Sequence, residues 1–129
     1  MKTLINYIII IILLGLTACT DHEEDTDKLS VQYRVSVDQP IIKNIIYKSA
    51  DKQMVTQTES LQDVTLWHKT VFINDSFDAY KNVMFYNNYE DTISYKLSIF
   101  VEGILVKTNE GIIHPDQETT ASLEYSVLD

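Results

Sequence analysis

Apolar and polar residues alternate with a period of two along most of the chain after residue 30, as they do in half-buried β-strands. The cleanest run is 93–101, where every second residue from Ile93 to Val101 is apolar. No segment after residue 19 repeats apolar residues every 3.6 positions over ten or more residues, so we expect no helix there. The pattern predicts strands over residues 31–37, 41–48, 53–58, 66–73, 82–87, 93–101, 104–108 and 119–127.

Turn-forming residues separate these strands. Pro40 ends the first one because proline cannot donate to a β-ladder, and Gly103 supplies the positive φ angle of a tight hairpin turn at Glu102-Gly103. We expect residues 77–80 to form a loop or a single turn, and Gly111 to lie in the last loop with residues 114–116. Short strands at this spacing predict an all-β domain, an immunoglobulin-like antiparallel β-sandwich of seven to eight strands.

The first nineteen residues follow a different pattern. Lys2 precedes the run Leu4–Leu16, which is apolar apart from Asn6. Thirteen helical residues span about 20 Å, against a hydrocarbon core of about 30 Å. This length is typical of a secretory signal peptide and too short for a comfortable permanent span.

The apolar run ends in Leu16-Thr17-Ala18-Cys19, which resembles the lipobox of bacterial lipoproteins. In that class the cysteine thiol is alkylated with diacylglycerol and a peptidase cuts before it. Cys19 is the only cysteine of the chain. The resemblance implies that residues 1–18 are a lipoprotein signal peptide, that Cys19 is the lipidation site, and that the membrane is reached through this lipid anchor. Because one acyl chain holds a protein only marginally, two or three would be needed for firm anchoring.

Residues 19–28 then read as the lipidated cysteine and an acidic, flexible tether. Residues 20–27 hold five acids and no large apolar side chain, so they cannot bury enough surface to order themselves. Fully extended, residues 20–29 reach about 33 Å. The acidic run also resembles the lipoprotein export signal of Bacteroidota, which implies a place in the outer membrane of the cell envelope, facing the periplasm or the cell surface. The alternative is that the acidic run is a solvated spacer that carries no localisation signal.

Composition narrows the possible partners. The chain has 129 residues and a formal charge of −9, and the part from Lys28 onward has nine bases and fourteen acids, a charge of −5. This balance argues against binding to nucleic acid and against direct adhesion to anionic lipid. At this length we expect one folded domain, the β-sandwich over residues 29–129, and a single cysteine excludes a disulfide within the chain.

Three motifs resemble the soluble domain of the mycobacterial MmpS family. They are Val31-Gln32-Tyr33-Arg34-Val35, Leu66-Trp67-His68-Lys69-Thr70-Val71 and Ile99-Phe100-Val101-Glu102-Gly103-Ile104-Leu105-Val106. The resemblance implies a β-sandwich, and it implies an accessory role beside a transporter of the RND type. The chain departs from the family in lacking its paired cysteines and in having a lipobox where the family has a membrane helix.

Side chains suited to catalysis or metal binding do not form a known pattern. His22, His68 and His114 lie far apart in the sequence, and no G-x-S-x-G motif is present. We therefore expect no metal, no cofactor and no enzymatic activity.

Tyrosines and asparagines crowd residues 82–95, a composition common on recognition surfaces. We expect Phe85 and Tyr95 in the core, and Tyr86 and Tyr89 as candidate exposed contacts. The sequence thus favours a lipid-anchored, non-catalytic binding or accessory module that docks on an envelope protein. The alternatives are an MmpS-like accessory subunit of an RND-type transporter and a small glycan-binding protein or hydrolase.

Overall fold

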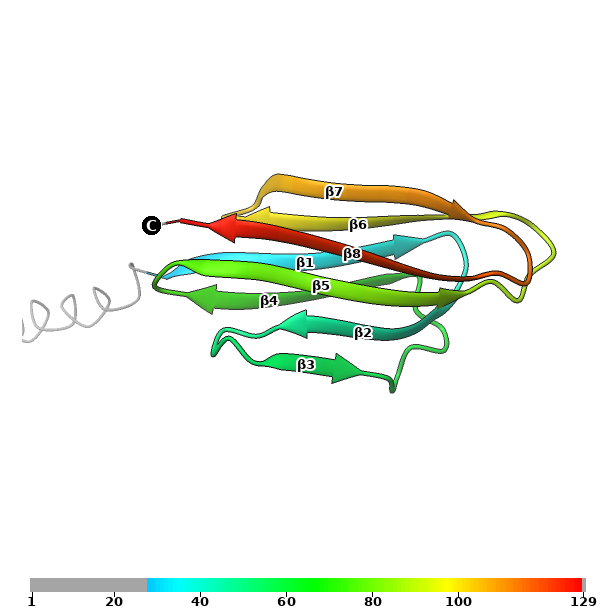
Figure 1. Ribbon diagram of the computed structural model, residues 1–129, viewed down its shortest axis with the longest axis horizontal. Helices are drawn as coiled ribbons and strands as arrows, with labels where there is room; N and C mark the ends of the chain where they lie inside the picture. Colours follow the sequence, from blue (N-terminus) through cyan, green and yellow to red (C-terminus); the bar gives the residue numbers. More distant parts are fainter. Residues whose placement is uncertain (1–27, 129) are drawn as a thin grey trace, which may run out of the picture.

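The computed structural model describes residues 28–128, which fold into two packed antiparallel sheets (Figure 1). The strand order is β4-β1-β6-β7 in one sheet and β3-β2-β5-β8 in the other, which confirms the predicted all-β sandwich. Residues 28–128 contain no helix of the length and apolarity needed to cross a membrane. The eight strands are β1 (Leu29–Val37), β2 (Ile42–Lys48), β3 (Met54–Gln57), β4 (Leu66–Ile73), β5 (Phe77–Tyr86), β6 (Ile93–Val101), β7 (Ile104–Ile113) and β8 (Glu118–Val127).

Side chains from the inner faces of both sheets form one core. In β1, Val31, Tyr33 and Val35 are fully buried, because this strand has a neighbour on each side and the other sheet beneath it. The rings of Tyr33, Tyr47 and Trp67 follow one another across the core at centroid distances of 5.8 and 5.6 Å. The alternation that predicted the strands therefore also sets which side chains are buried.

The long strand β5 corrects one prediction. Residues 77–80 were expected to form a loop or turn, but they are the first part of β5 and pair with β8 from Phe77 opposite Val127. The inward row of β5 includes a lysine, Lys81, between Ala79 and Val83, so its apolar alternation is interrupted. Because of this interruption, the sequence pattern predicts a loop followed by a short strand where the structure has one ten-residue strand.

Strand β7 corrects a second prediction. Gly111 was placed in the last loop, but it belongs to β7 and lies opposite Tyr95 of β6. The Tyr95 ring covers it, since a Cβ atom on Gly111 would come 2.5 Å from Tyr95 Oη. Here glycine marks the close approach of an aromatic side chain and not the end of the strand.

The hairpin between β6 and β7 confirms the predicted turn. Glu102 and Gly103 have φ angles of 51° and 76°, so both central residues adopt the positive φ of a type I′ turn. Just beyond the turn, the register shifts between Ile99 and Phe100, and Val106 of β7 is left without a paired residue. This β-bulge twists one edge of the sheet.

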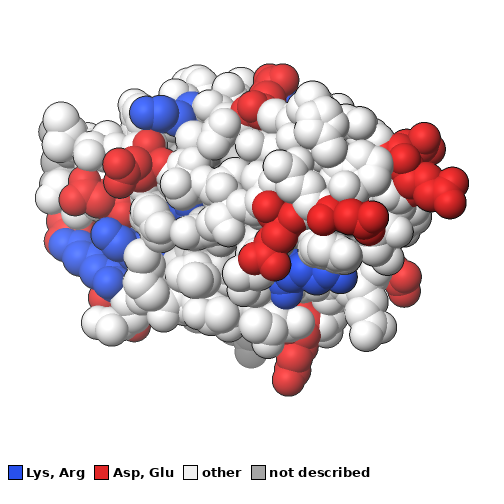
Figure 2. All heavy atoms as spheres, turned by 45° about the vertical axis from the view of Figure 1, so that its right-hand side comes forward, with Lys and Arg blue, Asp and Glu red and all other residues white. Residues whose placement is uncertain are grey.

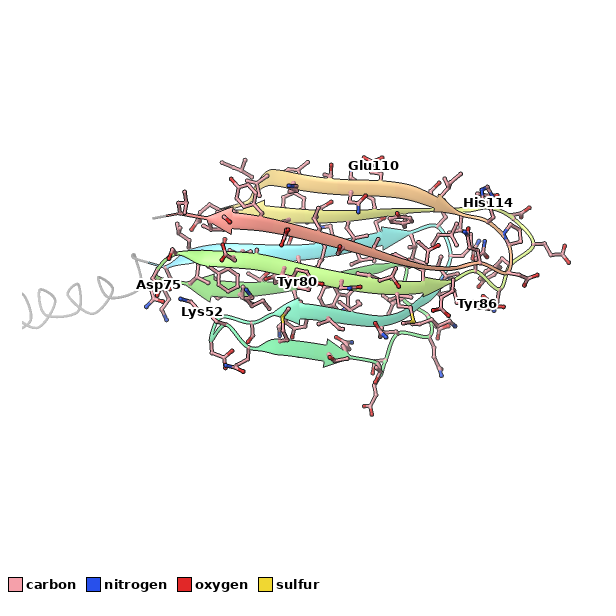
Figure 3. All side chains as sticks on the ribbon, in the orientation of Figure 1. Lys52, Asp75, Tyr80, Tyr86, Glu110 and His114 are labelled. Carbon is pink, nitrogen blue, oxygen red and sulfur yellow. The ribbon has the colours of Figure 1, made fainter. Side chains whose placement is uncertain are left out.

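The sandwich has two ends of different composition (Figure 3). We call the end where β1 begins and β8 finishes the proximal end; it comprises residues 28–30, 48–54, 72–78, 100–107 and 124–128. The opposite end, with the longer connections, is the distal end; it comprises residues 36–43, 57–66, 86–93 and 112–118. Figure 3 shows Lys52 and Asp75 at the proximal end and Tyr86 and His114 at the distal end.

Candidate functional site

The expected lipidation site lies outside the described residues, as do the signal peptide and residues 19–27 of the tether. The structure does place Lys28, the first residue that it describes. Lys28 directly precedes β1, so the chain joins the sandwich at its proximal end (Figure 1). Everything at the distal end is therefore a full strand length away from this junction.

The two candidate contact residues both lie at the distal end. Tyr86 is the last residue of β5 and its half-exposed side chain lies on the outer face of the sheet. Tyr89 follows in the connection to β6 and is 36% exposed. The ammonium of Lys43 on β2 lies 6.0 Å from the centre of the Tyr86 ring, at the outer limit of a cation–π contact.

A groove of about 570 Å³ runs between three connections of the distal end. It is lined by residues 40, 42–43, 58–63 and 88–89, so Tyr89 and Lys43 form part of its wall. Glu59 and Asp63 bring two carboxylates to the same groove. The groove thus offers an aromatic face, one cation and two anions, a combination suited to binding a polar chain.

The loop over residues 58–63 was not anticipated as part of the site. Its position depends on Leu61, which is 3% exposed and inserts into the core between polar neighbours. Ser60 beside it adopts a positive φ of 62°, which turns the backbone toward the groove. The one sequence signal for this arrangement is a single leucine in the polar stretch Thr58–Asp63.

The connection that holds Tyr89 is organised by Asn87. The Asn87 amide nitrogen donates to the backbone carbonyls of Asp91 and Ile113 at 2.8 and 2.9 Å, and its oxygen accepts from the Tyr89 N–H at 2.9 Å. Asn87 is fully buried and all its polar atoms are bonded. It is a positioning residue for Tyr89 and not a member of the exposed surface.

The expected core positions of the aromatic cluster are confirmed. Phe85 is fully buried, and Tyr95 packs partly buried against the core. Their rings stack at a centroid distance of 5.0 Å. The structure thus separates the cluster into core aromatics on one side and distal contacts on the other.

A second groove, of about 550 Å³, lies beside the proximal half of β5 and β8. Its wall includes Tyr80, Lys48, Lys107 and Glu124, so both signs of charge are present. Tyr80 shares the outer face of β5 with Tyr86, six residues away (Figure 3). This groove lies nearer to Lys28 than the distal groove does.

The two ends of the sandwich differ in net charge. The described proximal residues carry four bases and five acids, whereas the distal residues carry one base, Lys43, and seven acids. Figure 2 turns the distal end toward the viewer and shows acidic side chains spread over it. The distal end therefore has a formal charge of −6 and the proximal end −1.

The core between the ends contains a lysine that the sequence analysis did not single out. The Lys81 side chain is fully buried, and its Nζ donates to the backbone carbonyls of Arg34 and Ser98, the latter at 2.6 Å. Burial lowers the pKa of Lys81 to about 7, and the nearby Arg34 charge adds to the effect. Lys81 lines neither groove. Its inward position follows from the period-two row through Ala79 and Val83.

Metal-ligating side chains do not converge within the described chain. Among residues 28–128, no three His, Cys, Asp or Glu side chains are arranged to hold a metal ion. His68 lies exposed on β4, and His114 lies at the distal end with its Nδ1 3.4 Å from the Thr92 hydroxyl.

No protein family matches the chain, and no curated protein is significantly similar to it.

Proposed function

We propose that the protein is a lipid-anchored, non-catalytic binding or accessory module of the bacterial cell envelope, placed in the outer membrane through Cys19. One observation supports this most directly. The tether joins the sandwich at the proximal end, whereas Tyr86, Tyr89 and the distal groove lie at the opposite end. A domain built this way presents its recognition chemistry away from the lipid.

The mechanism is presentation of a surface. The lipid fixes the protein in the membrane plane, and the short tether gives the domain an effective concentration on the order of millimolar toward a membrane-bound partner. The distal charge of −6 would speed the encounter with a basic surface and disfavour an acidic one. Tyr86 and Tyr89 then supply flat contact area, because aromatic side chains contribute strongly at interfaces. The proposed partner is an envelope protein with a basic docking face.

No catalytic residue is assigned in this proposal. Lys81 has the shifted pKa of a reactive amine, but both sheets enclose it and substrate could not reach it. The carboxylates of Glu59 and Asp63 serve the same groove as the tyrosine and are assigned to binding.

A narrower proposal is an accessory role beside an RND-type transporter. The three MmpS-like motifs map onto β1, β4 and the β6–β7 hairpin, which all belong to the sheet β4-β1-β6-β7. Many of the matching residues, such as Val31, Tyr33 and Trp67, are buried. The likeness therefore concerns how one sheet packs, and a transport role needs its own test.

Site-specific photocrosslinking in intact cells tests the proposed function. A benzoylphenylalanine at position 86 or 89 should crosslink to an envelope protein, and the same residue at position 80, on the same face of β5, should give at least about fivefold less product. The Cys19→Ser variant should lose palmitate labelling and the crosslink together. Equal products from positions 80 and 86, or a crosslink that persists without lipidation, would contradict the proposal. Recovery of an RND permease would select the narrower proposal.

A further inference from the structure

Large apolar side chains are exposed mainly at the proximal end. Of the eight that are largely exposed among residues 28–128, five lie there. Phe72 and Leu105 lie on the outer face of the sheet β4-β1-β6-β7, and Ile104 at the β6–β7 turn is 67% exposed. The five are Met54, Phe72, Ile104, Leu105 and Leu128.

Two of these side chains, Ile104 and Leu105, lie next to the β6–β7 turn. Leu105 pairs with Phe100, and the Arg34 guanidinium lies over the Phe100 ring at 4.4 Å. Ile104 comes next to Leu105 at the turn itself. Exposed apolar groups gathered in this way mark a surface that something covers.

Charge at the proximal end is compatible with a lipid surface. Four lysines stand among five acids, so this end is almost neutral, whereas the distal end carries −6. Long lysine side chains can lay their methylene groups along an apolar boundary and keep the ammonium in water. An anionic lipid surface would therefore repel the distal end far more than the proximal end.

The short stretch between Cys19 and the sandwich also favours the proximal end as the end that contacts the membrane. Residues 20–29 reach about 33 Å when fully extended, so an anchor at Cys19 keeps Lys28 within that distance of the membrane. Strand β5 alone is ten residues long, about 33 Å, and separates the two ends by a similar length. The proximal end meets the lipid first, and the distal end could do so only if the domain turned over.

We propose that the proximal end rests on the surface of the bilayer in which Cys19 is anchored, with Phe72, Ile104 and Leu105 at the boundary between headgroups and acyl chains. This inference rests on the proposed lipid anchor. The contact gives the domain one orientation, in which β7 begins at the membrane surface and the distal groove faces outward. An interfacial apolar patch of this kind adds to the hold of the acyl chains.

Strand β7 offers a matched pair of probes. Ile104 and Ile112 are the same residue type on the same strand, 67% and 57% exposed, at opposite ends of the sandwich. Cys19 is the only native cysteine, so in the lipidated protein a cysteine introduced at either position is the only free thiol. Each variant, Ile104→Cys or Ile112→Cys, is labelled with an environment-sensitive fluorophore in the full lipidated protein.

The labelled proteins are reconstituted in vesicles of phosphatidylethanolamine and phosphatidylglycerol that contain a nitroxide-labelled lipid as quencher. We expect quenching at position 104 to exceed that at 112 at least threefold. Phe72→Cys and Leu66→Cys on β4 form a second pair, with the same expected difference. Equal quenching within both pairs would show that the tether holds the domain clear of the lipid and would overturn the inference.

Two further outcomes separate this inference from the anchor itself. If the protein fails to float with the vesicles, the lipid anchor is wrong and the inference falls with it. If it floats and position 104 is blue-shifted but unquenched, a protein surface or a second copy covers the patch, and only the membrane contact is overturned.

Discussion

The proximal and distal ends of this sandwich are built from the same eight strands but differ in chemistry. The proximal connections are tight, nearly neutral and bordered by exposed apolar side chains, as at Phe72 and Ile104. The distal connections are longer, strongly acidic and hold a groove walled by Tyr89 and Lys43. The core is common to both ends, so the difference lies in their connections and exposed side chains. We take it as support for the proposal that the two ends meet different surroundings.

The largest expected effect concerns Lys81, which lies in the core between the two ends. Its pKa is about 7 in the folded chain, against about 10.4 for an ordinary lysine. Between pH 7 and pH 10 the unfolded chain binds a proton that the folded chain does not bind. The free energy of unfolding should therefore rise by about 1 kcal/mol per pH unit in this window and become level below pH 7.

Lys81→Met keeps an unbranched side chain as far as the Cε position and removes the amine, so it should remove this slope. Urea denaturation of both proteins at pH 7, 8, 9 and 10 measures it, and groups common to both cancel in the difference. A variant with the wild-type slope would show that the buried ammonium is not responsible.

The next largest effect comes from Asn87→Ala, which should destabilise the distal end and leave the proximal end unchanged. Asn87→Ala removes three hydrogen bonds and leaves the carbonyls of Asp91 and Ile113 without this donor, which should lower the free energy of unfolding by about 2–3 kcal/mol. Hydrogen exchange at the Tyr89 amide should accelerate, whereas the Glu102 amide, bonded to Ser30 at the proximal end, should keep its protection. Asn88→Ala, at the exposed neighbouring position, is the control, with a change below about 0.5 kcal/mol. Equal effects of both substitutions would refute the assigned role of Asn87.

Two glycines of the β6–β7 hairpin give the smallest effects, one at each end. Gly111→Ala pushes a methyl group into the Tyr95 ring and should cost about 1–3 kcal/mol. Gly103→Ala meets open space but keeps a φ of 76°, which should cost about 1 kcal/mol. Thermal denaturation ranks them, and Tyr95→Leu in combination should relieve the Gly111→Ala defect but not the Gly103→Ala defect. Additive losses in both combinations would contradict the steric explanation.

Residues 66–73 and 93–101 match β4 and β6 at both ends. In β6 every inward position is apolar, and in β4 the single polar inward position, Lys69, is exposed because β4 is an edge strand. The two errors occur where a residue of the wrong type faces inward. Lys81 stands in an apolar row and donates to carbonyls of β1 and β6, and Gly111 makes room for Tyr95 across the β6–β7 hairpin. Neither contact can be read from the alternation of apolar and polar residues.

The candidate site was predictable only in part. Tyr86 and Tyr89 were recognised as contact candidates from composition, and both lie at the distal end. The rest of the groove comes from residues 40, 42–43 and 58–63, which join Tyr89 only through the order of strands across two sheets. Local sequence carries no record of that order, so Lys43 and the loop around Leu61 could not be assigned in advance.

The bulge at Val106 affects how readily neighbouring copies of the domain can pair through their edge strands. If Cys19 is lipidated as we propose, anchored copies share one plane, and their outermost strands meet side by side far more often than in free solution. β7 is a ten-residue edge, long enough to recruit a neighbour's strand and begin a fibril. The bulge bends this edge, and Lys107 and Glu110 place charges along it, so lateral fusion of neighbouring domains is disfavoured.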